Sequence, residues 1–174
     1  MNIFFTADTH FSHKNIIKFC KRPFKDINEM NESLISNWNA RVSKTDLVYH
    51  LGDFGFGDLS EILRRLNGDI ILILGSHDKN IYDYKNRFKL ITPLLTINLE
   101  TPITLCHYAM RVWSHSHYNS WHLYGHSHGG LESFGKSYDV GVDNNNFIPI
   151  SLQEIIETMK KKKDNFNLIK NRSE

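Results

Sequence analysis

The sequence predicts an α/β protein, because short apolar segments typical of strands alternate with amphipathic segments of helical period. Residues 47–53 show the pattern clearly: apolar residues lead to Gly52, and Asp53 follows the turn. Residues 70–74 are apolar throughout, which favours a central strand that is covered on both faces. In an open sheet of this kind, ligands bind outside the carboxyl ends of the strands.

Side chains suited to metal binding or catalysis follow five of the predicted strands, which lie near residues 2–7, 46–51, 69–74, 103–106 and 121–124. In chain order they are Asp8 and His10, Asp53, Ser76 with His77 and Asp78, His107, and His126 with His128. Asp and His clustered at strand ends are common metal ligands. The sequence therefore predicts a metal site at this edge.

The composition sets broad limits. A chain of 174 residues is long enough for one domain with a substantial core. The formal net charge of +2 neither requires nor excludes nucleic acid as a partner. Two cysteines, Cys20 and Cys106, without a secretory signal favour a reducing compartment, so we expect a cytoplasmic protein. No apolar run is long enough to span a membrane.

Helix starts are marked by capping residues. Asp26 followed by Glu29 predicts a helix that runs to about residue 41, with apolar residues at helical spacing. Residues 59–66 predict a short helix that ends before a glycine. Ser151 and Glu154 form a capping box for a last helix to about residue 159.

The other segments follow from turn signals and charge. They are a basic stretch at 14–25, a short helix or loop at 82–90, a hairpin of 94–99 with 103–106, an aromatic loop at 110–120, a strand at 138–142 and a solvated tail at 160–174. Because no repeat or linker is visible, we expect a single domain over residues 1–174.

The number of donors indicates two ions rather than one. One divalent ion rarely takes six Asp and His ligands while leaving room for a substrate. Two ions that share a bridging carboxylate would use them, typically about 3.5–4 Å apart. Two carboxylates and four neutral imidazoles leave a positive excess that attracts phosphate. Mixed oxygen and nitrogen donors suit Mn first, and also Fe, Zn, Ni or Co, better than Mg or Ca. The six donors are Asp8, His10, Asp53, His107, His126 and His128.

This arrangement resembles the calcineurin-like metallophosphoesterase superfamily. The resemblance rests on five motifs in the family's order: Asp8-x-His10, Gly52-Asp53, Gly75-Ser76-His77-Asp78, His107, and Gly125-His126-Ser127-His128. The segments around residues 5–11, 22–24 and 48–53 resemble a small bacterial and phage subgroup of predicted phosphoesterases. The resemblance implies a four-layer α/β/β/α sandwich, with two mixed sheets packed face to face and helices outside.

The resemblance also implies roles for individual residues. One ion would be held by Asp8, His10, Asp53 and His128, and the second by Asp53 as a bridge with His107 and His126. His77 would be the catalytic histidine beside the substrate, oriented by Asp78. The implied reaction is hydrolysis of a phosphoester by attack of a metal-bound hydroxide. The expected substrate is a phosphodiester, such as an oligonucleotide or cyclic nucleotide, or else a nucleotide monoester. We favour diesters, because no second domain is visible to restrict access.

One position departs from the family. The third motif normally carries an asparagine whose carbonyl oxygen binds the second ion, and this chain has Ser76 there. Serine is shorter, so water would fill the gap or the second site would be weak. Ser76 therefore leaves open an alternative, namely a scaffold or binding module of the same fold with an impaired metal site.

Two further residues are candidate substrate contacts. The guanidinium of Arg22 fits phosphate in a bidentate manner, with a surface cation as the alternative. His13 is the other candidate, although a structural role is favoured for it. His50 alternates with apolar residues inside a strand, so we expect a core histidine. A structural role is also favoured for the remaining three histidines, His115, His117 and His122.

Overall fold

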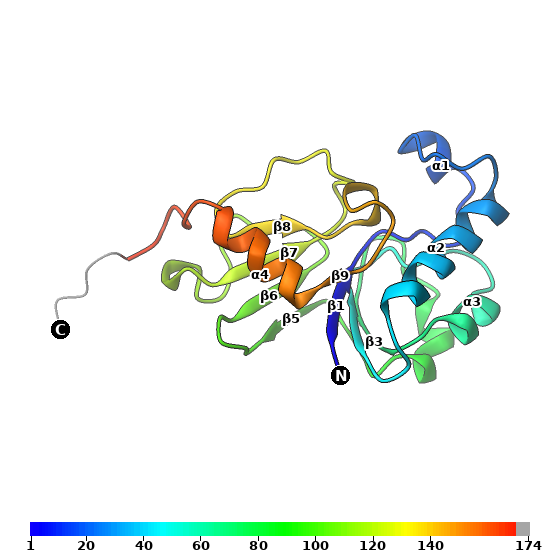
Figure 1. Ribbon diagram of the computed structural model, residues 1–174, viewed down its shortest axis with the longest axis horizontal. Helices are drawn as coiled ribbons and strands as arrows, with labels where there is room; N and C mark the ends of the chain where they lie inside the picture. The colour runs from blue at the N-terminus through cyan, green and yellow to red at the C-terminus, as the bar shows by residue number, and fades with distance from the viewer. Residues whose placement is uncertain (170–174) are drawn as a thin grey trace.

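The computed structural model describes residues 1–169, which form two mixed sheets flanked by helices (Figure 1). The first sheet has the strand order β4-β3-β2-β1-β9, where β1 to β4 are parallel and β9 is antiparallel to β1. Its strands are β1 (Ile3–Thr6), β2 (Leu47–His50), β3 (Asp69–Ile73), β4 (Leu90–Thr92) and β9 (Ile150–Ser151).

The second sheet has the order β5-β6-β7-β8. Its strands are β5 (Leu94–Ile97), β6 (Ile103–Cys106), β7 (Trp121–Tyr124) and β8 (Ser137–Asp139). β5 and β6 form the predicted antiparallel hairpin, and the other pairs are parallel. The predicted α/β fold of two mixed sheets with helices outside is confirmed.

The three α-helices that the sequence predicts begin at the predicted residue or within one residue of it. α2 (Ile27–Arg41) starts at Asp26, whose side chain accepts a hydrogen bond from the backbone of Glu29. α3 spans Ser60–Arg65. α4 (Leu152–Lys161) starts at the Ser151 capping box and runs two residues past the predicted end. None of the described helices is long and apolar enough to cross a bilayer.

The strand pleat divides the apolar side chains between two cores. Phe4 and Val48 pack in an outer core with residues of α2 and α3. Their neighbours Phe5 and Tyr49 pack in an inner core with residues of the second sheet and of α4. The rings of Phe5 and Tyr49 stack with centroids 5.4 Å apart. Because successive side chains of a strand point to opposite faces, the first sheet packs on helices with one face and on the second sheet with the other. The carboxyl ends of the strands in the two sheets meet at one edge.

Short elements differ from the predictions. α1 (Ile16–Phe19) lies in the basic stretch, where no helix was predicted. Within residues 82–90, a short helix (η1, Ile81–Arg87) is followed by β4, a strand that the sequence did not indicate. The strand predicted at 138–142 ends early with β8, because the Asp139 side chain accepts a hydrogen bond from the Gly141 backbone and a turn (η3, Val142–Asn144) follows.

The predicted solvated tail is wrong at Asn165. This side chain is buried, and its Nδ2 donates to the carbonyl oxygens of Ser116 and Ser120, each at 2.9 Å. The amide therefore ties the chain after α4 to the loop that holds the short helix η2 (Ser116–Tyr118). Residues 170–174 of the predicted tail lie outside the described residues.

Candidate metal centre

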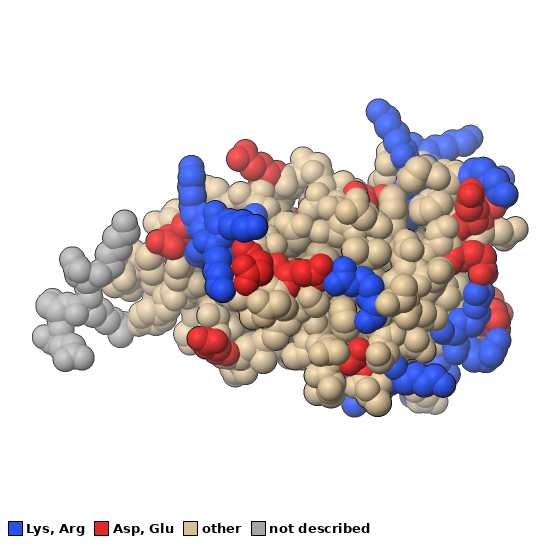
Figure 2. All heavy atoms as spheres, viewed as in Figure 1, with Lys and Arg blue, Asp and Glu red and all other residues tan. Residues whose placement is uncertain are grey.

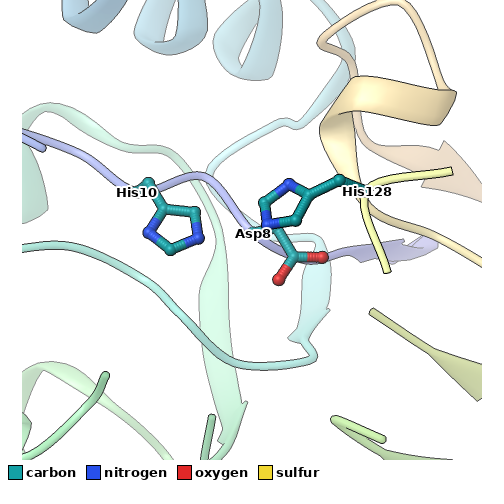
Figure 3. Close-up of side chains that lie close together, drawn as sticks. All are labelled: Asp8, His10 and His128. Carbon is teal, nitrogen blue, oxygen red and sulfur yellow. The ribbon is translucent and has the colours of Figure 1, made fainter. Parts of the chain in front are cut away.

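The six predicted ligands converge in two groups at the edge where the carboxyl ends of β1, β2, β6 and β7 meet. Within each group, one ligand atom per residue lies within 4.8 Å of the others: Asp8, His10 and His128 form the first group, and Asp53, His107 and His126 form the second. Figure 3 shows the first group, which comes from the segments that follow β1 and β7.

Buried polar atoms without hydrogen-bond partners indicate where a cation would bind. Oδ1 of Asp8, Nε2 of His10 and Nε2 of His107 are buried and have no hydrogen-bond partner. An unpaired buried polar atom is costly, so groups of them indicate an ion or another ligand. Oδ2 of Asp53 lies 3.7 Å from His10 Nε2 and 3.5 Å from His107 Nε2. The residues therefore fit two cations with Asp53 between them.

Hydrogen bonds fix the tautomers of two ligands. Nδ1 of His107 lies 2.7 Å from the carbonyl oxygen of Leu51, and Nδ1 of His128 lies 2.7 Å from Oδ2 of Asp143. These acceptors place a proton on each Nδ1, which leaves Nε2 as the lone-pair donor. Such outer partners orient metal-bound histidines.

The ionisation of Asp8 and His10 also fits a cation. Burial raises the pKa of Asp8 to about 7, and burial lowers the pKa of His10 to about 3. A neutral imidazole is the form that binds a metal, and a buried carboxylate with a raised pKa lacks a counter-charge. Burial opposes ionisation of Asp53 as well, but hydrogen bonds and charge interactions with His107, His77 and His10 together lower the pKa of Asp53.

Five of the six ligands have left-handed backbone conformations. The φ angles are 56° at Asp8, 49° at His10, 54° at Asp53, 67° at His126 and 48° at His128. Such residues cost on the order of 1–3 kcal/mol each and concentrate at functional sites. Asp and His are among the side chains that tolerate this region best. The fold therefore accepts strain at the residues that the motifs single out.

Gly52 allows the loops of the second group to approach closely. Its φ is +90°, and a Cβ there would lie 2.6 Å from Gly75 Cα and 2.6 Å from His107 Nδ1. Only glycine combines that conformation with that approach. Packing thus requires the glycine of the Gly52-Asp53 motif, and the proposed metal site requires the carboxylate of its aspartate.

The third motif lies against Asp53. Oγ of Ser76 donates towards the Asp53 carboxylate at 3.2 and 3.4 Å, and the backbone N–H of His77 donates to Oδ1 at 2.8 Å. The ring of His77 is exposed and lies 5.8 Å from that of His10, measured between centroids. Ser76 is therefore beside the proposed bridge, and His77 faces the open side.

Asp78 does not orient the His77 ring, contrary to the prediction. Its buried carboxylate accepts hydrogen bonds from the backbone N–H groups of Asp53, Phe54 and Gly75, at 2.9, 2.8 and 2.7 Å. The resemblance suggested a partner for the neighbouring imidazole, but the carboxylate turns inward to unpaired backbone donors. Asp78 therefore holds the loop that carries Asp53.

Arg22 is neither a surface cation nor placed to contact substrate. Its side chain is wholly buried, and Nε and Nη2 donate to Asp143 at 2.8 and 2.7 Å. Nη2 also donates to the carbonyl oxygen of Asp8 at 2.7 Å, and Nη1 to that of Thr9 at 3.0 Å. All three guanidinium nitrogens are thus engaged inside the protein, which corrects the prediction of a phosphate contact.

Two carboxylates that the sequence patterns do not single out lie behind the predicted ligands. Asp143 accepts hydrogen bonds from both Arg22 and His128, and Asp139 accepts from Ser127 Oγ and Gly129 N–H at 2.7 and 2.9 Å. Asp139 therefore holds the loop of His126 and His128. Asp143 directly follows the strand predicted at 138–142, so the strand-end pattern contains a signal for it. Asp139 lies inside that predicted strand and ends the observed β8, so the pattern gives no signal for it.

The other histidines occupy varied positions. Nδ1 of His13 lies 3.3 Å from His10 Nδ1, and its ring packs on Phe56 with centroids 4.2 Å apart, so His13 adjoins the first group. His50 is a buried core residue that contacts Thr9 Oγ1 at 2.9 Å. His122 is buried in β7, whereas His115 and His117 lie at η2.

Two hollows flank Phe56 and His77, and both of these residues line each hollow. One, of about 470 Å³, extends from the ligands to Ile16 and Phe19 at α1. The other, of about 340 Å³, extends away from the ligands towards Lys79 and the start of η1. The centre is therefore accessible and has room on two sides.

Comparison with known proteins gives similarities along nearly the whole chain. The calcineurin-like phosphoesterase family model matches residues 1–170. An uncharacterized protein of Methanocaldococcus jannaschii is 35% identical over 178 residues, which covers 92% of this chain and 93% of that protein. The Gene 66 protein of Mycobacterium phage L5 is 32% identical over 83 residues, 44% of this chain and 40% of its own. The crystal structure of a protein of unknown function from Aquifex aeolicus is 28% identical, covers 90% of this chain and 98% of its own, and has a TM-score of 0.73.

Proposed function

Because this chain belongs to the calcineurin-like phosphoesterase family and is a metal-dependent phosphoesterase, we propose that it uses two metal ions to hydrolyse a phosphodiester. The family and enzyme class predicted from the five motifs are confirmed. One observation carries the proposal of two ions: Oδ2 of Asp53 lies between the groups, 3.7 Å from His10 Nε2 and 3.5 Å from His107 Nε2.

In this proposal the first group and Asp53 hold one ion, and the second group holds the other. Two bound divalent ions supply Lewis-acid chemistry, since they activate a water nucleophile at neutral pH and neutralise charge on the phosphoryl oxygens. The donor set suits Mn first, with Fe, Zn, Ni or Co as alternatives. The carboxylate of Asp53 would contact both ions.

His77 is the proposed general acid. Its ring is exposed at the open side of the centre, while its backbone N–H is fixed to Oδ1 of Asp53 at 2.8 Å. A histidine held in this way can give a proton to the leaving oxygen as the phosphorus–oxygen bond breaks. His13, beside His10, is the candidate for contact with the non-bridging substrate oxygens.

The two hollows support a diester substrate. A phosphodiester carries two organic groups on phosphorus, and a hollow lies on each side of His77 and Phe56. A monoester would fill only one of them. An oligonucleotide or a cyclic nucleotide is therefore the preferred class, and a nucleotide monoester is second.

The test is metal content by elemental analysis together with hydrolysis of bis(p-nitrophenyl) phosphate and of p-nitrophenyl phosphate. We expect two ions per chain, activity with Mn that a chelator abolishes, and a higher kcat/KM on the diester. Asp53→Asn should lose both ions, because it is the proposed bridge. Full activity of the chelated protein would contradict the proposal, and a preference for the monoester would contradict the diester assignment.

The alternative is a scaffold of the same fold whose second site fails because Ser76 replaces asparagine. It predicts at most one bound ion and no turnover of either ester at any Mn concentration. Retention of the six other ligands in two converging groups favours the enzyme. The free thiols of Cys20 and Cys106 agree with the proposed cytoplasmic location.

A further inference from the structure

The basic stretch at residues 14–25 forms a charged surface beside the centre, which we call the α1 surface. From Thr9 to Lys25 the chain contains no Asp or Glu. Lys14, Lys18, Lys21 and Lys25 are all exposed, and no ion pair within residues 1–169 involves them. Figure 2 shows lysine and arginine side chains projecting from the end of the molecule where Figure 1 places α1.

An exposed aromatic ring lies among these lysines. Phe19 is 73% exposed, and among the described large hydrophobic side chains only Met1 at the N-terminus is more exposed. The ring is nevertheless on an anchored segment, since Ile16 is buried in the outer core and Arg22 is bound to Asp143. Phe19 is therefore exposed on a segment that is held in place on both sides.

The α1 surface is continuous with the proposed active centre. Ile16 and Phe19 line the hollow of about 470 Å³ that also contains His10, Asp53 and His77. A group bonded to phosphorus at the metal centre would extend from the ligands along this hollow to Phe19. Lys14, Lys18 and Lys21 lie within five residues of Phe19 in the chain.

We propose that the α1 surface binds single-stranded polynucleotide, with a base stacked on Phe19 and backbone phosphates held by Lys14, Lys18 and Lys21. Alternating cations and an exposed aromatic ring are what an unpaired strand requires, because phosphates need charge and unstacked bases need a flat apolar partner. The proposal rests on the proposed function, since it names the substrate class of that same centre. It places the strand from the scissile phosphate, through the hollow, onto α1.

Binding is tested in excess chelator, so that no hydrolysis occurs, by fluorescence anisotropy with fluorescein-labelled dT12 and U12. Phe19→Ala should weaken binding roughly 5- to 150-fold, the worth of one base–aromatic stack. Phe19→Trp should retain it. The triple change of Lys14, Lys18 and Lys21 to Ala should lower the slope of log K against log salt by about 2, because each single-strand phosphate contact adds about 0.7.

Matched controls separate this surface from general charge. Replacing Lys160, Lys161 and Lys163 by Ala removes the same number of exposed lysines at the end of α4, and Tyr82→Ala removes an exposed ring that is 55% accessible. Both controls should bind dT12 as the unchanged protein does. Equal losses in the controls would overturn the proposal.

A fluorescein-labelled peptide of twelve glutamates tests the competing partner, an acidic protein segment. We expect it to bind at least tenfold more weakly than the oligonucleotides and to be insensitive to Phe19→Ala. Equal affinity for the peptide, or oligonucleotide binding unchanged by Phe19→Ala, would contradict the proposal. Because this assay needs no catalysis, its failure is distinct from failure of the function, which is measured on bis(p-nitrophenyl) phosphate.

Discussion

Arg22 and Asp143 form a buried ion pair, 2.7 Å between Nη2 and Oδ2, that joins the two loops of the first group. Arg22 donates to the carbonyl oxygen of Asp8, and Asp143 accepts from Nδ1 of His128. The pair lies behind the ligands, so its contribution is to hold Asp8 and His128 at a fixed separation.

Asp143→Asn should therefore weaken binding of the first ion. The change removes the charge that orients the His128 imidazole and leaves the Arg22 guanidinium without its partner. Loss of such outer partners typically costs about 10–100-fold in metal affinity or activity. Calorimetric titration with Mn measures it, and Glu61→Ala, which breaks the exposed pair with Arg64, is the control. An unchanged first-site affinity would show that the pair only stabilises the fold.

His77→Ala should lower kcat by about 10²–10⁴, the usual worth of a general acid, while both ions remain bound. His77 supplies a backbone N–H to Asp53, which alanine also has, so the bridge keeps that contact. His115→Ala at the exposed start of η2 is the matched control and should keep full activity. Loss of metal from His77→Ala would assign the ring to the ligand shell instead.

Ser76→Asn should increase the binding affinity for the second ion. Asparagine extends further than serine from a position where the hydroxyl already lies 3.2 Å from Asp53 Oδ2. If asparagine supplies a missing ligand, second-site affinity and kcat should rise together by about 10–100-fold. Metal titration and hydrolysis rates over the same Mn range measure both, with the first-site affinity as the internal reference. Equal affinities and rates for both proteins would show that Ser76 is a competent substitute.

Ion binding should stabilise the fold. The buried Oδ1 of Asp8 and Nε2 of His10 and His107 have no partner in the protein, so cations relieve them. Free ion at 100 times its Kd adds about 2.7 kcal/mol to the free energy of unfolding. Thermal melts with Mn and with chelator measure this as a rise in Tm. Asp53→Asn should show a much smaller rise, and an identical rise would mean that Mn binds elsewhere.

Gly52→Ala should destabilise the protein far more than Gly57→Ala. Both glycines have positive φ, +90° and +66°, but a Cβ on Gly52 would lie 2.6 Å from Gly75 and His107, whereas one on Gly57 meets nothing within 4 Å. The control therefore carries only the conformational cost of a left-handed alanine, about 1–2 kcal/mol. Chemical denaturation measures both, and equal losses would show that the close approach relaxes freely.

Local chemistry explains what the sequence could predict. The caps at Asp26 and Ser151 act within three residues of themselves, so the starts of α2 and α4 are readable from the chain. The candidate ligands can be picked out from the sequence because each follows an apolar strand. Three-residue β4 and four-residue α1 were missed, since neither is long enough to show a period.

The misassigned residues depend on partners far along the chain. The sequence around Arg22 predicts a phosphate contact. In the fold, Arg22 instead binds Asp143, which lies 121 residues later in the chain. The resemblance pairs Asp78 with the neighbouring His77, yet its carboxylate oxygens accept hydrogen bonds from the backbone N–H groups of Asp53 and Phe54, some 25 residues earlier. No local pattern reports such pairings. Asp78 meets Asp53 when β3 pairs with β2, and Arg22 meets Asp143 when the segment after β8 reaches the end of β1.

The left-handed backbone at Asp8, His10, Asp53, His126 and His128 has a consequence for how this protein evolves. While the ions are needed, each position must combine a metal-binding side chain with tolerance of positive φ, and few residues other than Asp, Asn and His do both. In a lineage that abandons catalysis the first demand ends while the second persists. Those positions should then drift to glycine and asparagine rather than at random. In an alignment, such substitutions would identify relatives that have lost catalytic activity, before any assay is performed.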